Sequence, residues 1–364
     1  MNNISPIKAK IKGWGHYIPE KVVTNLDLEK VLDTSDAWIT KRTGIKERRF
    51  ANSSESTASM AIEAGKAALN KACLSGDDVD FIIVATNTPD ELTPPVSSVV
   101  QAALTNKHIP ATTMMAGCSG FMYGLDMAYQ FIGTNRYKRV LVIGSDFMSR
   151  FFDWEDRTTA VLFGDGAGAI LLEATENECG LYDSVFGSDG SQSDAIVLGG
   201  LVDSSHPSRK GKRTNVMDIN PPVNPFIFVD GSRVFKFATN MLASLFTELL
   251  TTVQVTEQEG VWCIPHQANL RIIKAAARTL NTPVERFITN IDRVANTSSA
   301  SIPIALAENL DSGKFKPSDF ICVWCWVNLG RVFNSSRAFI FLGKDHVYEY
   351  DTSLHATSYA EIGS

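Results

Sequence analysis

Short apolar runs alternate with stretches of helical length along the first half of the chain. The run at 80–86 follows a helix-like segment at 57–73, and the run at 139–144 follows a second such segment at 120–133. Another apolar strand spans 167–173. Apolar runs that alternate with helices are typical of strands buried in a mostly parallel or mixed sheet. The pattern therefore predicts an α/β fold.

The second half of the chain repeats this rhythm more weakly. A helical pattern at 234–253 leads into an apolar strand at 261–264, which precedes a further helical pattern at 268–280. Residues 80–86 and 260–265 thus occupy similar places in the two halves. This correspondence predicts an internal duplication.

The duplication divides the chain into an N-terminal half at 1–175, a C-terminal half at 176–343 and a tail at 344–364. Residues 204–224 are polar, basic and proline-bearing, which predicts a long surface loop. Such a loop is either an ordinary insertion between elements or a flap that faces the substrate.

Composition narrows the class of protein. Of the 364 residues, 44% are apolar and 20% are charged, as in a soluble globular protein with a substantial core. The net charge of −6 argues against general nucleic-acid binding. The N-terminus lacks the apolar run of a signal peptide, and no stretch approaches the roughly 18 apolar residues of a membrane span. The six cysteines are scattered, mostly in apolar segments, which predicts reduced thiols in the cytoplasm.

Cys118 is the first candidate for chemistry. It lies between Gly117 and Ser119-Gly120, just before the predicted helix at 120–133. Free amide groups and the positive end of a helix dipole favour a thiolate there, and the glycines allow a carbonyl group to approach closely. The alternative is a buried structural cysteine, which is the commoner fate of a free thiol.

His266 and Asn296 supply two further polar groups. His266 lies at a strand-to-helix turn, where a neutral imidazole can donate from Nε2 to an enolate oxygen or shuttle a proton. The Asn296 carboxamide is either a second donor or an ordinary helix N-cap. A decarboxylating Claisen reaction suits this set, because negative charge develops on one thioester oxygen and loss of CO₂ generates the nucleophile without a base. The sequence contains no recognisable cluster of metal ligands.

The three fragments resemble β-ketoacyl-acyl-carrier-protein synthase III, the initiating condensing enzyme of bacterial fatty-acid synthesis. The resemblance runs from about Ala9 to Asp319 and includes the segments 34–45, 153–157 and 159–168. It implies a thiolase-like fold with two duplicated βαβαβαββ halves in a five-layer αβαβα arrangement, working as a homodimer. It also implies an acyl-CoA primer and a malonyl-acyl-carrier protein as substrates, with no cofactor besides the coenzyme A thioester.

The resemblance assigns roles to several residues. It implies that Cys118 accepts the acyl group and that His266 and Asn296 assist malonyl decarboxylation. Trp38 and Arg157 match the residues that hold the adenine of coenzyme A, and Arg42 matches one near its phosphates. Aromatic and guanidinium planes stack on a base, and arginine binds phosphate. Without the motif, Trp38 is equally well explained as a partly buried core aromatic.

Further residues complete the expected site. Asn269, which starts the helical pattern after His266, is expected among the groups that bind the substrate or coenzyme A. A basic set near the expected tunnel mouth consists of Lys236, Arg271, Lys274 and Arg278. Since the last three follow helical spacing, they share a face and suit an acidic carrier protein. The alternative is a solvated helix face.

Thr93 departs from the pattern of the family. It stands where acetyl-specific members carry Phe, which projects into the acyl pocket of the partner subunit. The smaller side chain leads to the hypothesis of a roomier pocket that accepts primers longer than acetyl. Met115 and Ala295 also depart, since they stand where the family often has Asn and Gly.

The C-terminal segment departs most. The family ends with Gly-x-Gly-x-Thr-Trp-Gly, whose loop supplies a backbone N–H to the oxyanion hole, whereas residues 323–331 here read VWCWVNLGR. If the gene is read in a frame that is shifted by one base, the codons of Trp324 and Trp326 both become glycine codons. We therefore hypothesise a frameshift near Val323 in the gene or its recorded sequence, with an out-of-frame tail from about Lys344. If the sequence is genuine, the loop is malformed and the last strand of the second half is in doubt.

Competing interpretations remain open at this stage. A degradative thiolase needs a second catalytic cysteine followed by glycine, whereas Cys325 is followed by Trp326. Cys322 and Cys325 form either a redox or metal pair or part of a strand-like core. An acyltransferase of secondary metabolism would retain Cys118 but usually change Asn296. A catalytically impaired subunit is favoured by the aberrant loop and opposed by the intact trio.

Overall fold

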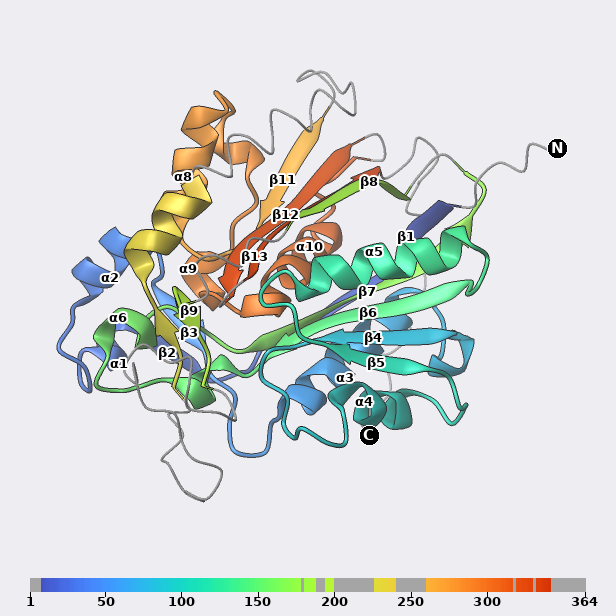
Figure 1. Ribbon diagram of the computed structural model, residues 1–364, viewed down its shortest axis with the longest axis horizontal. Helices are drawn as coiled ribbons and strands as arrows, with labels where there is room; N and C mark the ends of the chain where they lie inside the picture. Colours follow the sequence, from blue (N-terminus) through green and yellow to red (C-terminus); the bar gives the residue numbers. More distant parts are fainter. Residues whose placement is uncertain are drawn as a thin grey trace, which may run out of the picture.

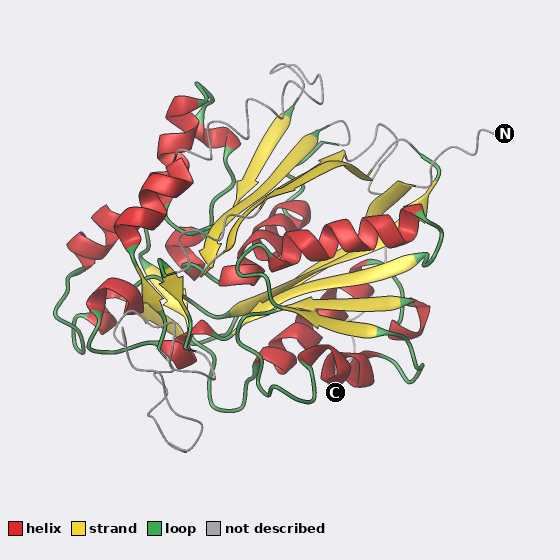
Figure 2. Ribbon diagram, viewed as in Figure 1, coloured by secondary structure: helices red, strands yellow, loops and turns green. Residues whose placement is uncertain are grey.

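The computed structural model describes residues 8–177, 180–187, 194–199, 226–239, 260–316, 319–329 and 332–341. Two β-sheets lie one above the other with helices between and outside them (Figures 1 and 2). The predicted loop at 204–224 and the tail at 344–364 lie outside the described residues, as does most of the helix predicted at 234–253, of which 231–239 is helical.

The first sheet has the strand order β1-β7-β6-β4-β5. Strand β4 runs parallel to both β5 and β6, whereas β7 runs antiparallel to β1 and β6. The five strands are β1 (Lys8–Tyr17), β4 (Phe81–Ala85), β5 (Ala111–Met114), β6 (Arg139–Asp146) and β7 (Gly166–Thr175).

The second sheet repeats this topology. Its strands are β8 (Gly180–Gly187), β11 (Val261–Pro265), β12 (Phe320–Leu329) and β13 (Val332–Phe341). The order β8-β13-β12-β11, with two antiparallel pairs and then a parallel one, matches β1-β7-β6-β4. A single parallel bridge between Cys263 and Phe287 stands where a fifth strand would pair. The expected internal duplication is confirmed, and β4 and β11 are the equivalent strands.

Helices complete five layers (Figure 1). Helices α3 (Thr57–Lys71) and α4 (Val96–Leu104) cover the outer face of the first sheet. Helices α5 (Gly120–Gly133) and α10 (Ser301–Asp311) lie between the sheets, and α8 (Leu270–Thr279) packs on the outer face of the second. This arrangement confirms the α/β, thiolase-like fold.

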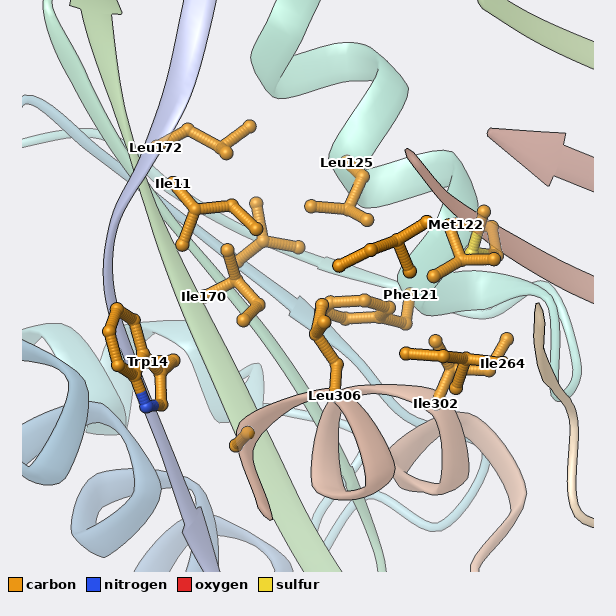
Figure 3. Packing of buried hydrophobic residues seen from close by; sticks show 14 of the residues in the cluster. Ile11, Trp14, Phe121, Met122, Leu125, Ile170, Leu172, Ile264, Ile302 and Leu306 are labelled. Atoms are coloured by element: carbon orange, nitrogen blue, oxygen red, sulfur yellow. The ribbon is translucent and has the colours of Figure 1, made fainter. Parts of the chain in front are cut away.

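The middle layer holds the largest core (Figure 3). Phe121 and Leu125 of α5 meet Ile302 and Leu306 of α10, and each of these side chains is at most 1% exposed. Burial of such a side chain contributes about 1.5–3 kcal/mol. The packing fixes the starts of α5 and α10, where the polar site lies.

Strand β12 alternates its side chains between two cores. Ile321, Val323 and Cys325 join the middle layer, whereas Cys322 and Trp324 pack toward α8. Since Cys322 and Cys325 face opposite sides of the sheet and both are buried, they belong to the core rather than to a redox or metal pair. The strand continues to Leu329 and pairs with β13, so a last strand is present after the aberrant segment.

A smaller lobe packs beside one end of the two sheets. Its elements are α1 (Asn25–Leu28), α2 (Asp36–Thr43), α6 (Arg157–Ala160), α9 (Ile291–Val294), the pair β2 (Val22–Thr24) and β3 (Glu47–Arg49), and the pair β9 (Ile196–Val197) and β10 (Phe228–Val229). Four short 3₁₀ turns in the described chain are η1 (Gly76–Asp78), η2 (Met148–Phe151), η5 (Val284–Arg286) and η6 (Ser298–Ala300). In the described part of the chain, no helix is long and apolar enough to cross a membrane.

Candidate active site

Cys118 lies between β5 and the start of α5. Gly117 has φ +62°, a conformation that favours glycine, and Ser119 is the N-cap of the helix. Cys118 is half-buried, and its Sγ atom lies 3.5 Å from Ser298 Oγ. Burial raises the pKa of the Cys118 thiol to about 12, while the hydrogen bond with Ser298 acts in the opposite direction. The helix start that was expected to favour a Cys118 thiolate is present. However, burial disfavours the charged thiolate, and the sequence did not reveal this cost.

His266 follows β11 directly and is 1% exposed. Its Nδ1 atom lies 2.6 Å from Ser301 Oγ, at the start of α10. Its backbone N–H donates to the Trp324 carbonyl at 2.7 Å, which ties it to β12. Burial lowers the pKa of His266 to about 3, so the imidazole is neutral at physiological pH. A neutral ring can donate from Nε2 when Nδ1 accepts from Ser301.

Asn296 lies in the loop after α9. Its backbone N–H donates to the Leu162 carbonyl at 3.1 Å, and its own carbonyl accepts from Gly164 at 3.0 Å. The Oδ1 atom accepts from the Ser298 N–H at 2.9 Å. Because Oδ1 is occupied within its own loop, the Nδ2 group is the part of the carboxamide that can donate to a bound oxygen. The side chain bonds within the loop and does not cap an α-helix.

A cavity of about 690 Å³ brings these groups together. Cys118, His266 and Asn296 all line it, although they come from three distant parts of the chain. Trp38, Arg42, Asn269 and Arg271 line the same cavity. Its volume is in the range of small-molecule sites. The sequence-predicted trio and two of the three predicted coenzyme A residues thus share one space.

Two guanidinium groups lie close to the Trp38 ring. The Arg42 group is 5.7 Å from the centroid of its ring, and the Arg157 group is 5.5 Å away. Arg157 does not itself line the cavity among the described residues and pairs with the Asp33 carboxylate at 3.2 Å. The half-buried ring with cations beside it is a surface on which a base can stack.

Asn269 connects α8 to α2. Its Oδ1 atom accepts from the Arg271 N–H at 2.9 Å as the N-cap of α8, and its Nδ2 donates to the Arg42 carbonyl at 3.1 Å. Both ends of the carboxamide are therefore used by the protein. This residue holds the wall of the cavity in place.

The basic set lies on the outside of the molecule. Lys236, Arg271, Lys274 and Arg278 are all exposed, and the last three share α8. The Arg271 guanidinium lies 5.1 Å from the centroid of the Phe235 ring, which links the helix to the segment at 231–239. Because Arg271 also lines the cavity, the set begins at its rim.

Thr93 is not brought to this cavity within one chain. It is exposed on the loop before α4 and joins Pro94 through a cis peptide bond. Among the described residues, Asn87 is the part of this loop that lines the cavity, and Thr93 is not in its wall. A role for Thr93 in the pocket therefore requires a second copy of the chain.

Sequence reasoning missed three polar residues beside the nucleophile. Ser298, Asn87 and Asp146 are joined by hydrogen bonds near Cys118. Asp146 ends a buried apolar strand, and a carboxylate in that place is a signal that could have been used. In the described residues, no group of three or more His, Cys, Asp or Glu side chains could hold a metal ion.

Comparisons with known proteins identify the family of the chain. Sequence models of the 3-oxoacyl-[acyl-carrier-protein] synthase III family match residues 113–190, and those of its C-terminal part match 250–326. Beta-ketoacyl-[acyl-carrier-protein] synthase III 1 of Bacillus anthracis is 44% identical over 311 residues, which is 85% of this chain and 92% of the relative. The synthase III of Caldanaerobacter subterraneus is 44% identical over 319 residues, covering 86% of this chain and 93% of the relative.

Solved structures show the same likeness. The 3-oxoacyl-[acyl-carrier-protein] synthase III from Aquifex aeolicus superposes with a TM-score of 0.80 at 40% identity, covering 91% of this chain and 99% of that chain. The synthase III of Thermus thermophilus gives 0.82 at 36% identity, covering 91% and 98%. The resemblance predicted from the motifs is confirmed, and the chain belongs to the β-ketoacyl-[acyl-carrier-protein] synthase III family.

Proposed function

We propose that the protein condenses an acyl-CoA primer with a malonyl-acyl-carrier protein, the initiating reaction of fatty-acid synthesis. The observation that carries the proposal is the convergence of Cys118, His266 and Asn296 in one cavity, with Trp38 and Arg42 in its wall. A thiol nucleophile and two neutral donors match the two halves of that reaction. The high identity to synthase III relatives supports the same reading.

The first half-reaction transfers the acyl group to Cys118. The Cys118 thiolate attacks the thioester carbonyl carbon, and collapse of the tetrahedral adduct breaks the bond to the coenzyme A sulfur. The departing thiolate takes up the proton that Cys118 lost, so the step is neutral overall. The apolar walls of the cavity, which include Met148, Phe163 and Ile227, suit an acyl chain.

The second half-reaction forms the carbon–carbon bond. The malonyl carboxylate leaves as CO₂, and its bonding electrons form an enolate whose oxygen accepts hydrogen bonds from His266 and Asn296. The enolate carbon attacks the acyl-cysteine carbonyl, and the bond to Sγ breaks to release β-ketoacyl-carrier protein and the Cys118 thiolate. Because both donors are uncharged, they stabilise the enolate without also binding the malonyl carboxylate tightly.

Two binding surfaces follow from this assignment. Trp38, flanked by Arg42 and Arg157, would stack the adenine and contact the phosphates of coenzyme A. The exposed basic set at Lys236, Arg271, Lys274 and Arg278 would receive an acidic carrier protein.

We also propose a cytoplasmic homodimer. Strand β5 is an edge strand, and Leu92 and Met115 near it are 69% and 65% exposed. A second copy covering this edge would bury them and bring its own Thr93 loop toward the acyl pocket. The small Thr93 side chain suits primers longer than acetyl. The free thiols of Cys73, Cys118, Cys263, Cys322 and Cys325 suit a reducing compartment.

Intact-protein mass spectrometry tests the proposed function. The protein is incubated with acetyl-CoA, hexanoyl-CoA or octanoyl-CoA, and then with malonyl-acyl-carrier protein. We expect a mass gain of one acyl group that is absent in Cys118→Ala, followed by its loss as β-ketoacyl-carrier protein and CO₂ appear. An ester or amide product with another acceptor would instead support an acyltransferase, and no gain in folded protein would overturn the proposal. A strict preference for acetyl-CoA would overturn the longer-primer hypothesis.

A further inference from the structure

The hydroxyl group of Ser298 faces the nucleophile. Its Oγ atom lies 3.5 Å from Cys118 Sγ, and the residue is 3% exposed. Ser298 has φ +53°, in the left-handed region that residues with a Cβ atom rarely adopt. The hydrogen bond from its N–H to Asn296 Oδ1 helps to hold this conformation. A residue kept in an unfavourable conformation beside a nucleophile indicates that its side chain has a use there.

The neighbouring Asn87 determines which way the Ser298 hydrogen points. Asn87 Nδ2 donates to Ser298 Oγ at 3.0 Å. An amide nitrogen only donates, so Ser298 Oγ is the acceptor in this bond. The hydroxyl hydrogen is then available for Cys118 Sγ, the other neighbour of Ser298 Oγ among the described residues.

Asp146 fixes the orientation of the Asn87 amide. The Asn87 N–H donates to Asp146 Oδ1 at 2.7 Å, and Asn87 Nδ2 lies 3.5 Å from Asp146 Oδ2. Because an ionised carboxylate only accepts, it attracts the amide nitrogen and repels the amide oxygen. The same buried carboxylate accepts from Ser299 N at 2.9 Å, which anchors the loop that carries Ser298. The chain of donors therefore runs from Asn87 through Ser298 to Cys118.

We infer that Ser298 is a further catalytic residue, whose hydroxyl donates to Cys118 Sγ in its thiolate state, and that Asn87 is a positioning residue that aims this hydroxyl. This inference deepens the proposed function and rests on it for the role of Cys118. A hydrogen bond to a thiolate is charge-assisted, whereas the sulfur of a thioester is a poor acceptor. The bond is therefore strongest before acyl transfer and again when condensation releases Sγ. It opposes the desolvation that burial imposes on the thiolate.

Alkylation of Cys118 by iodoacetamide tests this inference without any acyl-CoA. The rate at Cys118 is measured by peptide mass spectrometry, which separates it from the exposed thiol of Cys73, across a pH series in wild type, Ser298→Ala, Asn87→Ala and the double variant. We expect Ser298→Ala to slow alkylation about tenfold or more at a fixed pH near 8, as loss of a hydrogen bond to a charged group predicts. Asn87→Ala should slow it less, since the hydroxyl remains but can turn. The double variant should be no slower than Ser298→Ala.

Ser145→Ala is the matched control. Ser145 is buried and next to Asp146, but its hydroxyl donates to the Thr57 carbonyl at 2.8 Å and not toward Cys118. Cys118 in the Ser145→Ala variant should be alkylated at the wild-type rate. Ser298→Gly, which suits φ +53°, repeats the test if Ser298→Ala fails to fold.

Wild-type rates in folded Ser298→Ala or Ser298→Gly would overturn the inference, as would additive effects in the double variant. Failure of the proposed function has a different signature, because wild type would then be alkylated at Cys118 but would not be acylated by any acyl-CoA.

Discussion

The buried environment of His266 makes the folded protein less stable at acidic pH. Burial holds its pKa at about 3 in the folded state, against about 6.5 in an unfolded chain. As pH falls below about 6.5, the unfolded chain binds a proton at His266 and the folded protein does not, so unfolding becomes more favourable. At pH 5 this effect amounts to about 2 kcal/mol. Urea unfolding at pH 7 and pH 5 should therefore show a smaller loss in His266→Asn than in wild type. Equal losses would contradict the assigned neutral imidazole.

Ala295 carries backbone strain next to the active-site loop. It has φ +56° and ψ −153°, a region occupied almost only by glycine. Ala295→Gly should relieve about 1–3 kcal/mol of strain while losing about 0.4–1 kcal/mol to the greater freedom of the unfolded chain. We expect a net gain of about 1 kcal/mol, seen as a higher melting temperature, with acylation of Cys118 unchanged. A lower melting temperature would show that the Ala295 methyl group packs more favourably than its conformation costs.

At the scale of elements, Gly44 sets the distance between α2 and α8. It ends α2 with φ +83°, and a Cβ atom there would lie 2.5 Å from Leu270 Cβ. Gly44→Ala should push apart the helices that carry Trp38 and Asn269, raising the KM for acyl-CoA more than it lowers kcat. Gly313→Ala is the control, because Gly313 has φ +63° but open space around it. If both variants lower the melting temperature equally and leave KM unchanged, the α2–α8 contact does not govern coenzyme A binding.

The same elements show what the sequence could and could not predict. The helix expected at 57–73 is α3, which ends at Lys71, and that expected at 120–133 is α5; buried apolar positions mark both, and a Ser56 cap marks α3. The equivalence of β4 and β11 was also visible, since each is an apolar run that follows a helical pattern. The contact of Ser298 with Cys118 was not, because it joins residues 180 positions apart and depends on a positive φ in a residue other than glycine. Likewise, the hydrophobic pattern did not indicate that Ser301 contacts His266, because this contact forms where the end of β11 meets the start of α10.

At the scale of the whole molecule, the exposed edge near β5 predicts a dimer. Met115→Glu places a charge on a side chain that is 65% exposed in the single chain and would be buried by a partner. We expect light scattering to give twice the chain mass for wild type and the single-chain mass for Met115→Glu. Leu26→Glu, at a residue 62% exposed on α1, is the control and should remain dimeric. A monomeric wild type would remove the basis for a role of Thr93 in the partner's pocket.

The aberrant C-terminal segment bears on the activity of the whole protein. Strand β12 pairs with β13 without a break from Phe320 to Leu329, so its backbone groups at 324–329 belong to a regular hairpin. The family has a glycine-rich loop there, from which a backbone N–H reaches the acyl-cysteine oxygen. In such a hairpin every second N–H group is bonded to the facing strand, so this segment has fewer free donors than a glycine-rich loop. The family match that ends at residue 326 supports the frameshift hypothesis.

Resequencing the locus tests the frameshift directly, and a chain rebuilt in the shifted frame from Trp324 onward tests its consequence. Loss of one oxyanion donor slows acyl transfer by about 10²–10³-fold. We therefore expect the printed chain to be acylated by acyl-CoA that much more slowly than the rebuilt chain. Alkylation by iodoacetamide forms no oxyanion, so its rate at Cys118 should be similar in both. If acylation is equally fast in the two chains, the hairpin supplies the oxyanion donor in another way. The segment at 323–331 is then compatible with a working enzyme.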